Sequence, residues 1–308
     1  MPYWFEPTSV SVEVGGRTMK IETGKVAKQA AGAVTVTYGD TVVLVTAVHS
    51  SPRPGIDFFP LTVDFVEKFA AAGKIPGGFF KREGRLADRE VLVSRFIDRS
   101  IRPLFADGYN DETQVTATVL SHDPEHSADM CAFVGASAAL SISEIPFLGP
   151  IAAVRIGRVD GDFMINPLPE DLEESDLELI VAGNKGSIVM VEGGAKQLPE
   201  DEVLGALRHA HDQIQPIIEA IEGFAAKVGK EKLETPEAPD HSALEARIKD
   251  MAGDRLSEAF QIKEKKSRAD SVKAIEKEIR EEIWNEYRNE EVEVKSLADF
   301  EARQNGLK

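Results

Sequence analysis

The sequence predicts an α+β fold, in which a large layered core is followed by a small all-helical domain. Three observations lead to this prediction. Short runs of alternating or β-branched residues recur between residues 10 and 191, helical patterns lie between them, and a stretch rich in lysine, glutamate and proline precedes a purely helical region. Strands and helices do not alternate strictly, which favours a mixed layered core over a parallel α/β sheet.

Eight segments of the core have the composition of strands, because they are rich in β-branched residues and are bounded by turn residues. The Gly39-Asp40 pair joins two of them as a hairpin. The predicted strands are residues 10–14, 34–38, 41–48, 61–66, 114–120, 152–158, 177–182 and 187–191. Apolar residues at helical spacing predict three helices, residues 83–101, 127–143 and 199 to about 226.

A domain boundary is predicted where the composition changes, within residues 229–239. We therefore divide the chain into a core, residues 1–230, and a helical domain, residues 231–308. The helical domain is expected to contain helices at residues 241–251, 254–260, 267–287 and 297–302. The longest of them balances acidic and basic side chains, which is typical of a solvated face, and we assign no chemistry to those charges.

Composition points to an intracellular protein with a substantial core. The chain has 308 residues and 42% hydrophobic content, enough for one large domain and a smaller one. Its single cysteine, Cys131, cannot form an internal disulfide, and no charged-then-apolar leader opens the sequence. The longest apolar stretch, about residues 131–142, is too short and too serine-rich to span a membrane. We expect a cytoplasmic protein with no membrane partner.

A glycine-flanked segment carries the strongest functional signal. It places Phe79 and Phe80 directly before Lys81 and Arg82, with Arg85 shortly after. Adjacent aromatic rings suit stacking on unpaired bases and adjacent cations suit a phosphate backbone, so this segment predicts a contact point for single-stranded RNA. In the alternative interpretation the phenylalanines fold into the core and the cations are solvated, and local pattern alone favours that alternative.

The predicted helix that follows carries a narrow stripe of arginines, Arg95, Arg99 and Arg102. Its many apolar residues predict a mostly buried helix, on which three guanidinium groups need anionic partners. We expect the stripe to face phosphate groups; the alternative partner is internal, because Asp98 can reach Arg102.

Positive charge is concentrated in this region of an acidic protein. The formal net charge is -17, which argues against a protein that simply coats nucleic acid. Between residues 81 and 102, however, the cations Lys81, Arg82, Arg85, Arg89, Arg95, Arg99 and Arg102 outnumber the anions Glu83, Asp88, Glu90 and Asp98. A localised basic surface on an acidic body would admit RNA at a chosen point.

The runs FFKREGR and SRFIDRSIRPLF resemble the signature of the first core of the polynucleotide phosphorylase family. Agreement extends in order and spacing over nearly the whole chain, through the segments ETG at 22–24, DFFPLTV at 57–63, AGKIPG at 72–77, VGASAAL at 134–140 and VAG at 181–183. The resemblance implies a ribonuclease-PH-like core joined to an all-helical linker domain. It also implies a ring-forming, trimeric, phosphate-dependent 3′-to-5′ exoribonuclease that converts mRNA to nucleoside diphosphates with Mg²⁺ and inorganic phosphate, with RNA-degradation machinery as a further partner.

The same resemblance indicates that this core lacks the catalytic groups. Active cores resemble one another in a D-x-x-x-x-x-D-x-K pattern before the VAG strand, and the matching positions here are Leu172, Glu178 and Ile180. The matching phosphate-binding turn, residues 121–129, contains three carboxylates that would repel phosphate: Asp123, Glu125 and Asp129. A metal cluster of His122, Asp123 and His126 is the alternative for this turn, but N-capping by Asp and Ser explains those residues more simply. We therefore expect no catalytic residue and no metal ligand in this chain.

The resemblance thus predicts the inactive first core and most of the helical linker of a polyribonucleotide nucleotidyltransferase, with the sequence ending before a second core. Phe79 and Phe80 would stack on bases, Lys81, Arg82 and Arg85 would contact the RNA backbone, and Arg95, Arg99 and Arg102 would contact phosphates or the interface between cores. The alternative function is a non-catalytic RNA-binding or scaffold module.

Overall fold

The computed structural model describes residues 7–52, 58–79, 81–235 and 240–289. The chain forms two compact units, Met1–Pro236 and Glu237–Lys308. The boundary expected from composition, after residue 230, lies slightly before this division.

The first sheet of unit 1 holds the amino-terminal strands. Adjacent strands of this sheet run antiparallel, except that β5 runs parallel to β6. Burial alternates along β3 and the first part of β4, as expected for strands with one face in the core, and in β3 the buried valines alternate with less buried threonines. The strand order is β1 (Thr8–Val14), β2 (Arg17–Thr23), β3 (Gly32–Tyr38), β4 (Thr41–Ser50), β6 (Glu112–Ser121) and β5 (Leu61–Val66).

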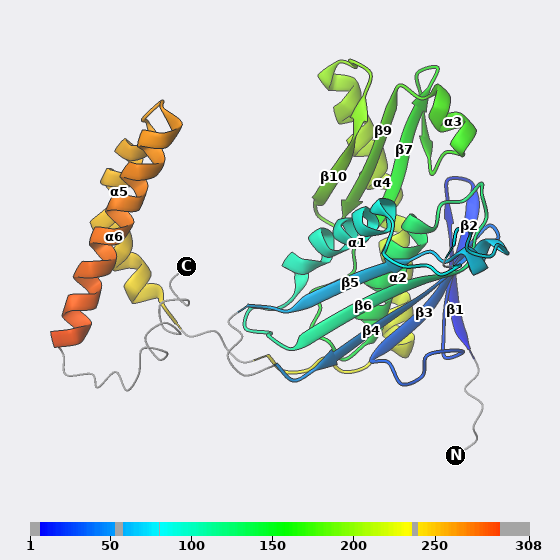
Figure 1. The fold of residues 1–308 in the computed structure, drawn as a ribbon, viewed down its shortest axis with the longest axis horizontal. Helices are drawn as coiled ribbons and strands as arrows, with labels where there is room; N and C mark the ends of the chain where they lie inside the picture. The colour runs from blue at the N-terminus through cyan, green and yellow to red at the C-terminus, as the bar shows by residue number, and fades with distance from the viewer. Residues whose placement is uncertain (1–6, 53–57, 80, 236–239, 290–308) are drawn as a thin grey trace. The chain divides into compact units, whose positions relative to one another are not determined.

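The second sheet lies above the first in the view of Figure 1 and is antiparallel throughout. Its strand order is β10 (Ile188–Ala195), β9 (Leu177–Gly183), β7 (Ala152–Val159) and β8 (Asp162–Ile165). Strand β9 is central and carries two of the positions that match the catalytic pattern.

The α-helices described in unit 1 are α1 (Asp88–Ile101), α2 (Ala128–Ile142), α3 (Pro169–Glu174) and α4 (Glu200–Val228). Two short 3₁₀ turns, η1 (Phe69–Ala72) and η2 (Arg102–Leu104), flank the segment that contains α1. Helix α1 packs on β5, and α4 packs on β1, β7 and β9. Helix α2 contacts strands of both sheets as well as α4, and every residue from Ala128 to Leu140 is buried.

Unit 2 is a helical hairpin in which α5 (Ser242–Phe260) packs along α6 (Lys265–Asn289). Its buried contacts come from Ala252, Ala259, Ile275, Ile279 and Ile283. The two helices predicted at 241–251 and 254–260 are one continuous helix, because Gly253 sits in α5 without ending it. The helix predicted at 297–302 lies outside the described residues.

The predicted α+β fold is confirmed, with a few elements that the sequence did not predict. Strand β8 and helix α3 are short, with four and six residues, and β2 and α3 hold few apolar residues, so the periodicity of all three is weak and their neighbours decide their conformation. Helix α1 begins at Asp88 rather than at residue 83, and the preceding residues form a loop. None of the described helices combines the length and the apolarity needed to cross a membrane.

Replacing Gly135 tests the close approach of α2 to the first sheet, and Gly223 on α4 serves as the control. A Cβ at Gly135 on α2 would lie 2.4 Å from Val45 Cγ2, whereas a Cβ at Gly223 on α4 would meet no atom within 4 Å. Replacing either glycine by alanine gains about 1 kcal/mol of helix propensity. We predict that Gly135→Ala nevertheless lowers the free energy of unfolding by about 1–3 kcal/mol through overpacking, whereas Gly223→Ala raises it. Urea denaturation measures both, and a stabilised Gly135→Ala variant would contradict the packing argument.

Candidate nucleic-acid interface

The segment between η1 and α1 exposes an aromatic ring. Phe79 is 94% exposed, so this phenylalanine does not fold into the core. Phe80 lies outside the described residues. Gly78, with φ of +77°, adopts a left-handed backbone conformation that other residues rarely adopt. The alternative that placed the phenylalanines in the core is therefore excluded for Phe79.

Two carboxylates, Glu83 in this segment and Glu90 in the first turn of α1, hold the loop to the rest of the core. Glu83 Oε1 accepts a hydrogen bond from the Phe69 N–H at 2.5 Å. Glu90 accepts one from the Ala87 N–H at 2.6 Å and another from the Glu67 N–H at 2.8 Å. Both carboxylates therefore accept hydrogen bonds from backbone N–H groups at the base of the loop.

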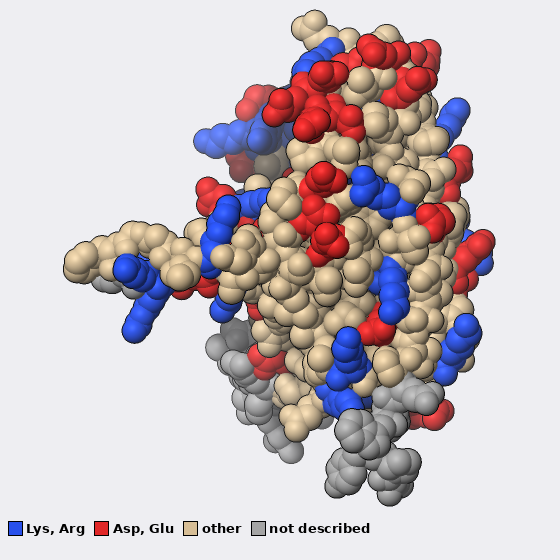
Figure 2. Space-filling model, turned by 90° about the vertical axis from the view of Figure 1, so that its right-hand side faces the viewer, with Lys and Arg blue, Asp and Glu red and all other residues tan. Residues whose placement is uncertain are grey.

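The cations of the loop face solvent. Lys81, Arg82 and Arg85 are all exposed, and within the described residues none of the three forms an ion pair. On the face shown in Figure 2, basic side chains are scattered, whereas carboxylates gather near the upper edge, the end of the core that holds α3. A polyanion would be repelled at that end and attracted at the loop.

The structure divides the predicted arginine stripe into two parts. Arg95 and Arg99 lie on the exposed face of α1 beside Leu92, which is 58% exposed. The expectation of a mostly buried helix is wrong, because α1 covers the first sheet with one face only. The guanidinium of Arg99 lies 3.8 Å from the exposed carboxylate of Glu192 on β10, an ion pair of little strength in water.

Arg102 has internal partners instead. Its Nη2 and Nε donate to the Asp98 carboxylate at 2.6 and 3.3 Å, and its Nη1 and Nη2 donate to the carbonyl oxygens of Phe59 and Leu61 at 3.2 and 3.1 Å. Most of the guanidinium donors are therefore used within the core. For Arg102 the structure supports the internal alternative over a phosphate contact.

The three positions that match the catalytic pattern do not form a metal site. Leu172 lies in α3 and Ile180 on β9, and neither side chain offers an oxygen ligand. Glu178 on β9 forms an ion pair with Arg155 on β7. A divalent metal therefore does not fit this set of residues.

Arg155 is the centre of a largely buried ionic group. Its Nη2 lies 2.5 Å from Asp129 Oδ2, and the Asp129 side chain is only 4% exposed. Burial by itself would lower the pKa of Arg155, but the carboxylates of Asp129 and Glu178 outweigh it and raise that pKa. A fixed guanidinium therefore neutralises the one carboxylate of the catalytic pattern that this chain retains.

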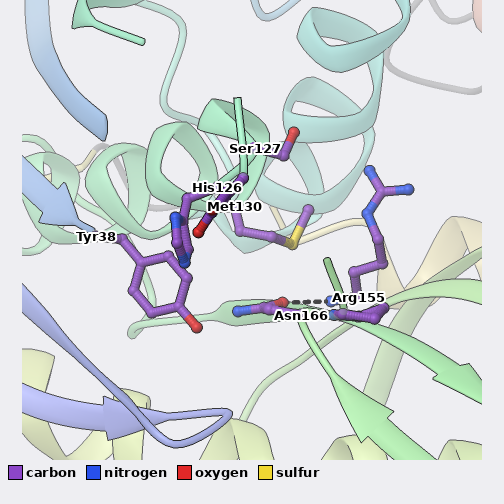
Figure 3. Close-up of a pocket in the computed structure, with 8 residues that line it drawn as sticks. Tyr38, His126, Ser127, Met130, Arg155 and Asn166 are labelled. Atoms are coloured by element: carbon purple, nitrogen blue, oxygen red, sulfur yellow. Dashed lines mark hydrogen bonds between the residues drawn. The ribbon is translucent and has the colours of Figure 1, made fainter. Parts of the chain in front are cut away.

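A cavity of about 20 Å³ lies between the turn before α2 and the second sheet (Figure 3). This volume has room for about one water molecule. Asn166 Oδ1 accepts a hydrogen bond from the Arg155 backbone N–H at 3.0 Å. The lining residues are Tyr38, Glu125, His126, Ser127, Met130, Arg155, Asn166 and Pro167. Glu125 in this wall and the small volume argue against a phosphate site.

The turn before α2 brings Asp123, Glu125 and His126 together, with candidate ligand atoms within 4.8 Å of one another. Their contacts are hydrogen bonds that fasten the β3–β4 hairpin: Asp123 Oδ2 pairs with His126 Nδ1 at 2.6 Å and accepts from the Asp40 N–H at 3.2 Å. Burial would raise the pKa of Asp123, but the hydrogen bonds from Glu125, His126 and Asp40 lower it overall.

The predicted N-capping role of this turn is wrong in detail. Ser127 occupies the N-cap position of α2 but makes no capping hydrogen bond with its side chain. Its hydroxyl instead accepts a hydrogen bond from Arg89 Nη2 at 2.9 Å. Asp123 closes the turn by accepting the Glu125 N–H at 2.9 Å. Contacts within the turn and with the β3–β4 hairpin account for Asp123 and His126. The Glu125 carboxylate lies 4.0 Å from the guanidinium of Arg17 on β2.

Comparison with known proteins agrees with this architecture. Residues 15–146 match the sequence model of the 3′ exoribonuclease family, domain 1, and residues 149–213 match that of domain 2. The chain belongs to this family. Residues 243–301 match the model described as polyribonucleotide nucleotidyltransferase, RNA binding domain.

Curated relatives carry the name polyribonucleotide nucleotidyltransferase. The protein of Geobacter sulfurreducens is 52% identical over 294 residues, which cover 95% of this chain and 42% of the relative. That of Rhodospirillum centenum is 54% identical over 269 residues, which cover 85% of this chain and 38% of the relative. The chain thus spans about two fifths of the length of these relatives.

A solved structure supports the fold of unit 1. The crystal structure of rice (Oryza sativa) Rrp46 has a TM-score of 0.57 to this chain at 14% identity, and the match covers 70% of this chain and 96% of the rice chain. At this identity the likeness supports the fold alone. Together with the two family-model matches, it confirms the ribonuclease-PH-like core.

Sequence patterns did not lead us to predict the Arg155 group. A usable signal was present, because an arginine interrupts the apolar strand sequence AAVRIGRV and a charge inside a buried strand needs a partner. The identity of the partner, Asp129, was not predictable from spacing.

Removing the guanidinium tests its role in neutralising the buried carboxylate. We predict that Arg155→Met lowers the free energy of unfolding by about 3–5 kcal/mol, because Asp129 is left charged and buried. Most of this decrease should be recovered in the double variant with Asp129→Asn, whose amide needs no cation. Arg158→Met on the same strand is the matched control with a smaller expected decrease, because its partners Asp176 and Glu202 are more exposed. Equal destabilisation by the two arginine substitutions in chemical denaturation would contradict this account.

Proposed function

We propose that this chain is the RNA-guiding, non-catalytic part of a phosphorolytic 3′-to-5′ exoribonuclease. The observation that carries the proposal is the loop before α1, where the 94%-exposed Phe79 adjoins the exposed cations Lys81, Arg82 and Arg85. Aromatic stacking on bases and charge contacts with the backbone together hold single-stranded RNA without sequence preference. Family membership supports RNA as the ligand.

Within this proposal the residues have distinct roles. Phe79 stacks on a base, with Phe80 assigned the same role by its place in the sequence. Lys81, Arg82 and Arg85 contact the RNA backbone, and Arg95 and Arg99 on the exposed face of α1 extend the basic surface. Arg102 positions α1 through its contacts with Asp98 and the Phe59 and Leu61 carbonyl groups.

Catalysis is proposed to reside elsewhere in the longer protein. Mg²⁺ and inorganic phosphate serve the reaction there, because Leu172 and Ile180 provide no ligands and Glu178 is paired with Arg155. We further propose that the whole protein assembles as a trimeric ring in the cytoplasm and degrades mRNA, in association with RNA-degradation machinery. The ring is proposed from the resemblance to the family, and the exposed apolar residues Val91 and Leu92 on α1 support a surface for self-association.

Substitution of the loop residues separates stacking from charge. We predict that Phe79→Ala weakens single-stranded RNA binding by roughly 1–3 kcal/mol with little change in salt dependence. The Lys81→Ala/Arg82→Ala variant should instead flatten the slope of log affinity against log salt by about 0.7 for each phosphate that is no longer neutralised. Fluorescence anisotropy with a labelled oligoadenylate over a salt series measures both quantities.

Matched controls for this test lie elsewhere on unit 1. Phe58→Ala removes another exposed phenylalanine, and Lys196→Ala/Lys227→Ala removes two exposed lysines. Neither control should change RNA affinity appreciably. A folded Phe79→Ala variant with unchanged affinity would rule out the stacking role.

The non-catalytic assignment makes a direct prediction about activity. We expect the purified 308-residue chain to release no nucleoside diphosphates from single-stranded RNA in the presence of phosphate and Mg²⁺. The full-length relative from Geobacter sulfurreducens serves as the positive control, and thin-layer chromatography of labelled RNA detects the products. Phosphate-dependent shortening of RNA by this chain would show that the core is catalytic.

A further inference from the structure

The turn between α5 and α6 of unit 2 combines an exposed aromatic ring with a cluster of cations. Phe260, the last residue of α5, is 64% exposed. Lys263, Lys265 and Lys266 follow within six residues and are all exposed. Sequence patterns assigned no chemistry to this part of the chain.

The exposure of Phe260 follows from the packing of the hairpin. Ala259 occupies the buried position at this end of α5, where it contacts the cluster that includes Ile275, Ile279 and Ile283. The next residue of a helix is turned by about 100° from its neighbour, so Phe260 falls outside the interface between the two helices. The exposed ring leaves an aromatic face open to stacking on an unpaired base.

The charged neighbours of the lysines are used to build the turn itself. Glu264 accepts hydrogen bonds from the backbone N–H groups of Lys266 and Ser267 at 2.9 and 2.6 Å, and hydrogen bonding from Ser267 lowers its pKa. Arg268 Nη1 donates to the carbonyl oxygens of Ile262 and Lys263 at 3.0 and 3.4 Å. The turn is thereby held in shape, while the three lysines project positive charge from an acidic protein.

We propose that Phe260, Lys263, Lys265 and Lys266 form a second contact site for single-stranded RNA, separate from the loop before α1. Phe260 stacks on a base and the lysines contact consecutive phosphates. The match of residues 243–301 to a domain described as RNA binding includes this turn, although that description names no residues. The proposal rests on the proposed function only for the choice of RNA as the ligand.

The composition of the turn favours RNA over a protein partner. Lysine is depleted in the centres of protein interfaces, whereas three lysines around one aromatic ring are suited to a polyanion with unpaired bases. Sequence-independent binding to phosphates also depends on lysine and arginine in this way. If the folded Phe260 variants kept full RNA affinity, a protein partner at this ring would be favoured instead.

The experiment compares five forms of the 308-residue chain by anisotropy with labelled oligoadenylate over a salt series. They are the parent chain, Phe260→Ala, Phe260→Leu, Lys265→Ala/Lys266→Ala, and the matched control Lys249→Ala/Lys273→Ala, which removes two exposed lysines from the same two helices. Circular dichroism melting establishes that each variant is folded. The same set is repeated in a Phe79→Ala background.

We expect Phe260→Ala and Phe260→Leu each to weaken RNA binding about tenfold, because leucine retains apolar bulk but cannot stack as an aromatic ring does. Lys265→Ala/Lys266→Ala should lower the salt slope by about 1.4, and the control pair should leave it unchanged. Unchanged affinity in the folded Phe260 variants would overturn the proposal. Full affinity in Phe260→Leu alone would also overturn it, because it would show that apolar bulk, and not aromatic stacking on a base, makes the contact. Failure of the loop before α1 to bind RNA would appear separately, as an unchanged affinity of Phe79→Ala.

Discussion

Helix α2 lies at the centre of the core, and its close approach to the first sheet depends on Gly135. It is buried from Ala128 to Leu140 and contacts both sheets and α4, so a larger residue at Gly135 would meet Val45 directly. Because the interior is closely packed at this contact, a change in the position of α2 would also have to move the strands that it touches. Helix α1 contacts α2 directly, and β9, which carries Glu178, is held through its pairing with β7, which also packs on α2.

The first turn of α2 also links the core packing to the positions that match the catalytic pattern. Asp129 is buried there, and Arg155 on β7 joins it to Glu178 on β9. A guanidinium bound on both sides by carboxylates supplies positive charge permanently and needs no exchangeable ion. Unit 1 thereby retains the architecture of a ribonuclease-PH-like core while its remaining carboxylate of the catalytic pattern serves an internal ion pair.

The proposed binding features lie instead on segments that the core holds but does not cover. The loop before α1 is fastened at its base by Glu83 and Glu90, and the α5–α6 turn by Glu264 and Arg268. In both places these charged side chains form hydrogen bonds with backbone groups, while the neighbouring cations and the aromatic ring remain exposed. Held loops of this kind lose less conformational entropy when they bind a flexible RNA strand.

The sequence by itself determined the α+β class, most of the strands, the basic segment before α1 and the apolar residue types at two positions of the catalytic pattern, because these depend on local periodicity and on single positions. Which cations have hydrogen-bonding or ion-pair partners depends on contacts that only the folded chain makes. Arg102 reaches the carbonyl oxygen of Phe59, 43 residues away, and Arg155 reaches Asp129, 26 residues away. A charge is free or paired according to atoms that the fold brings together across such separations, and no spacing along the chain encodes that proximity.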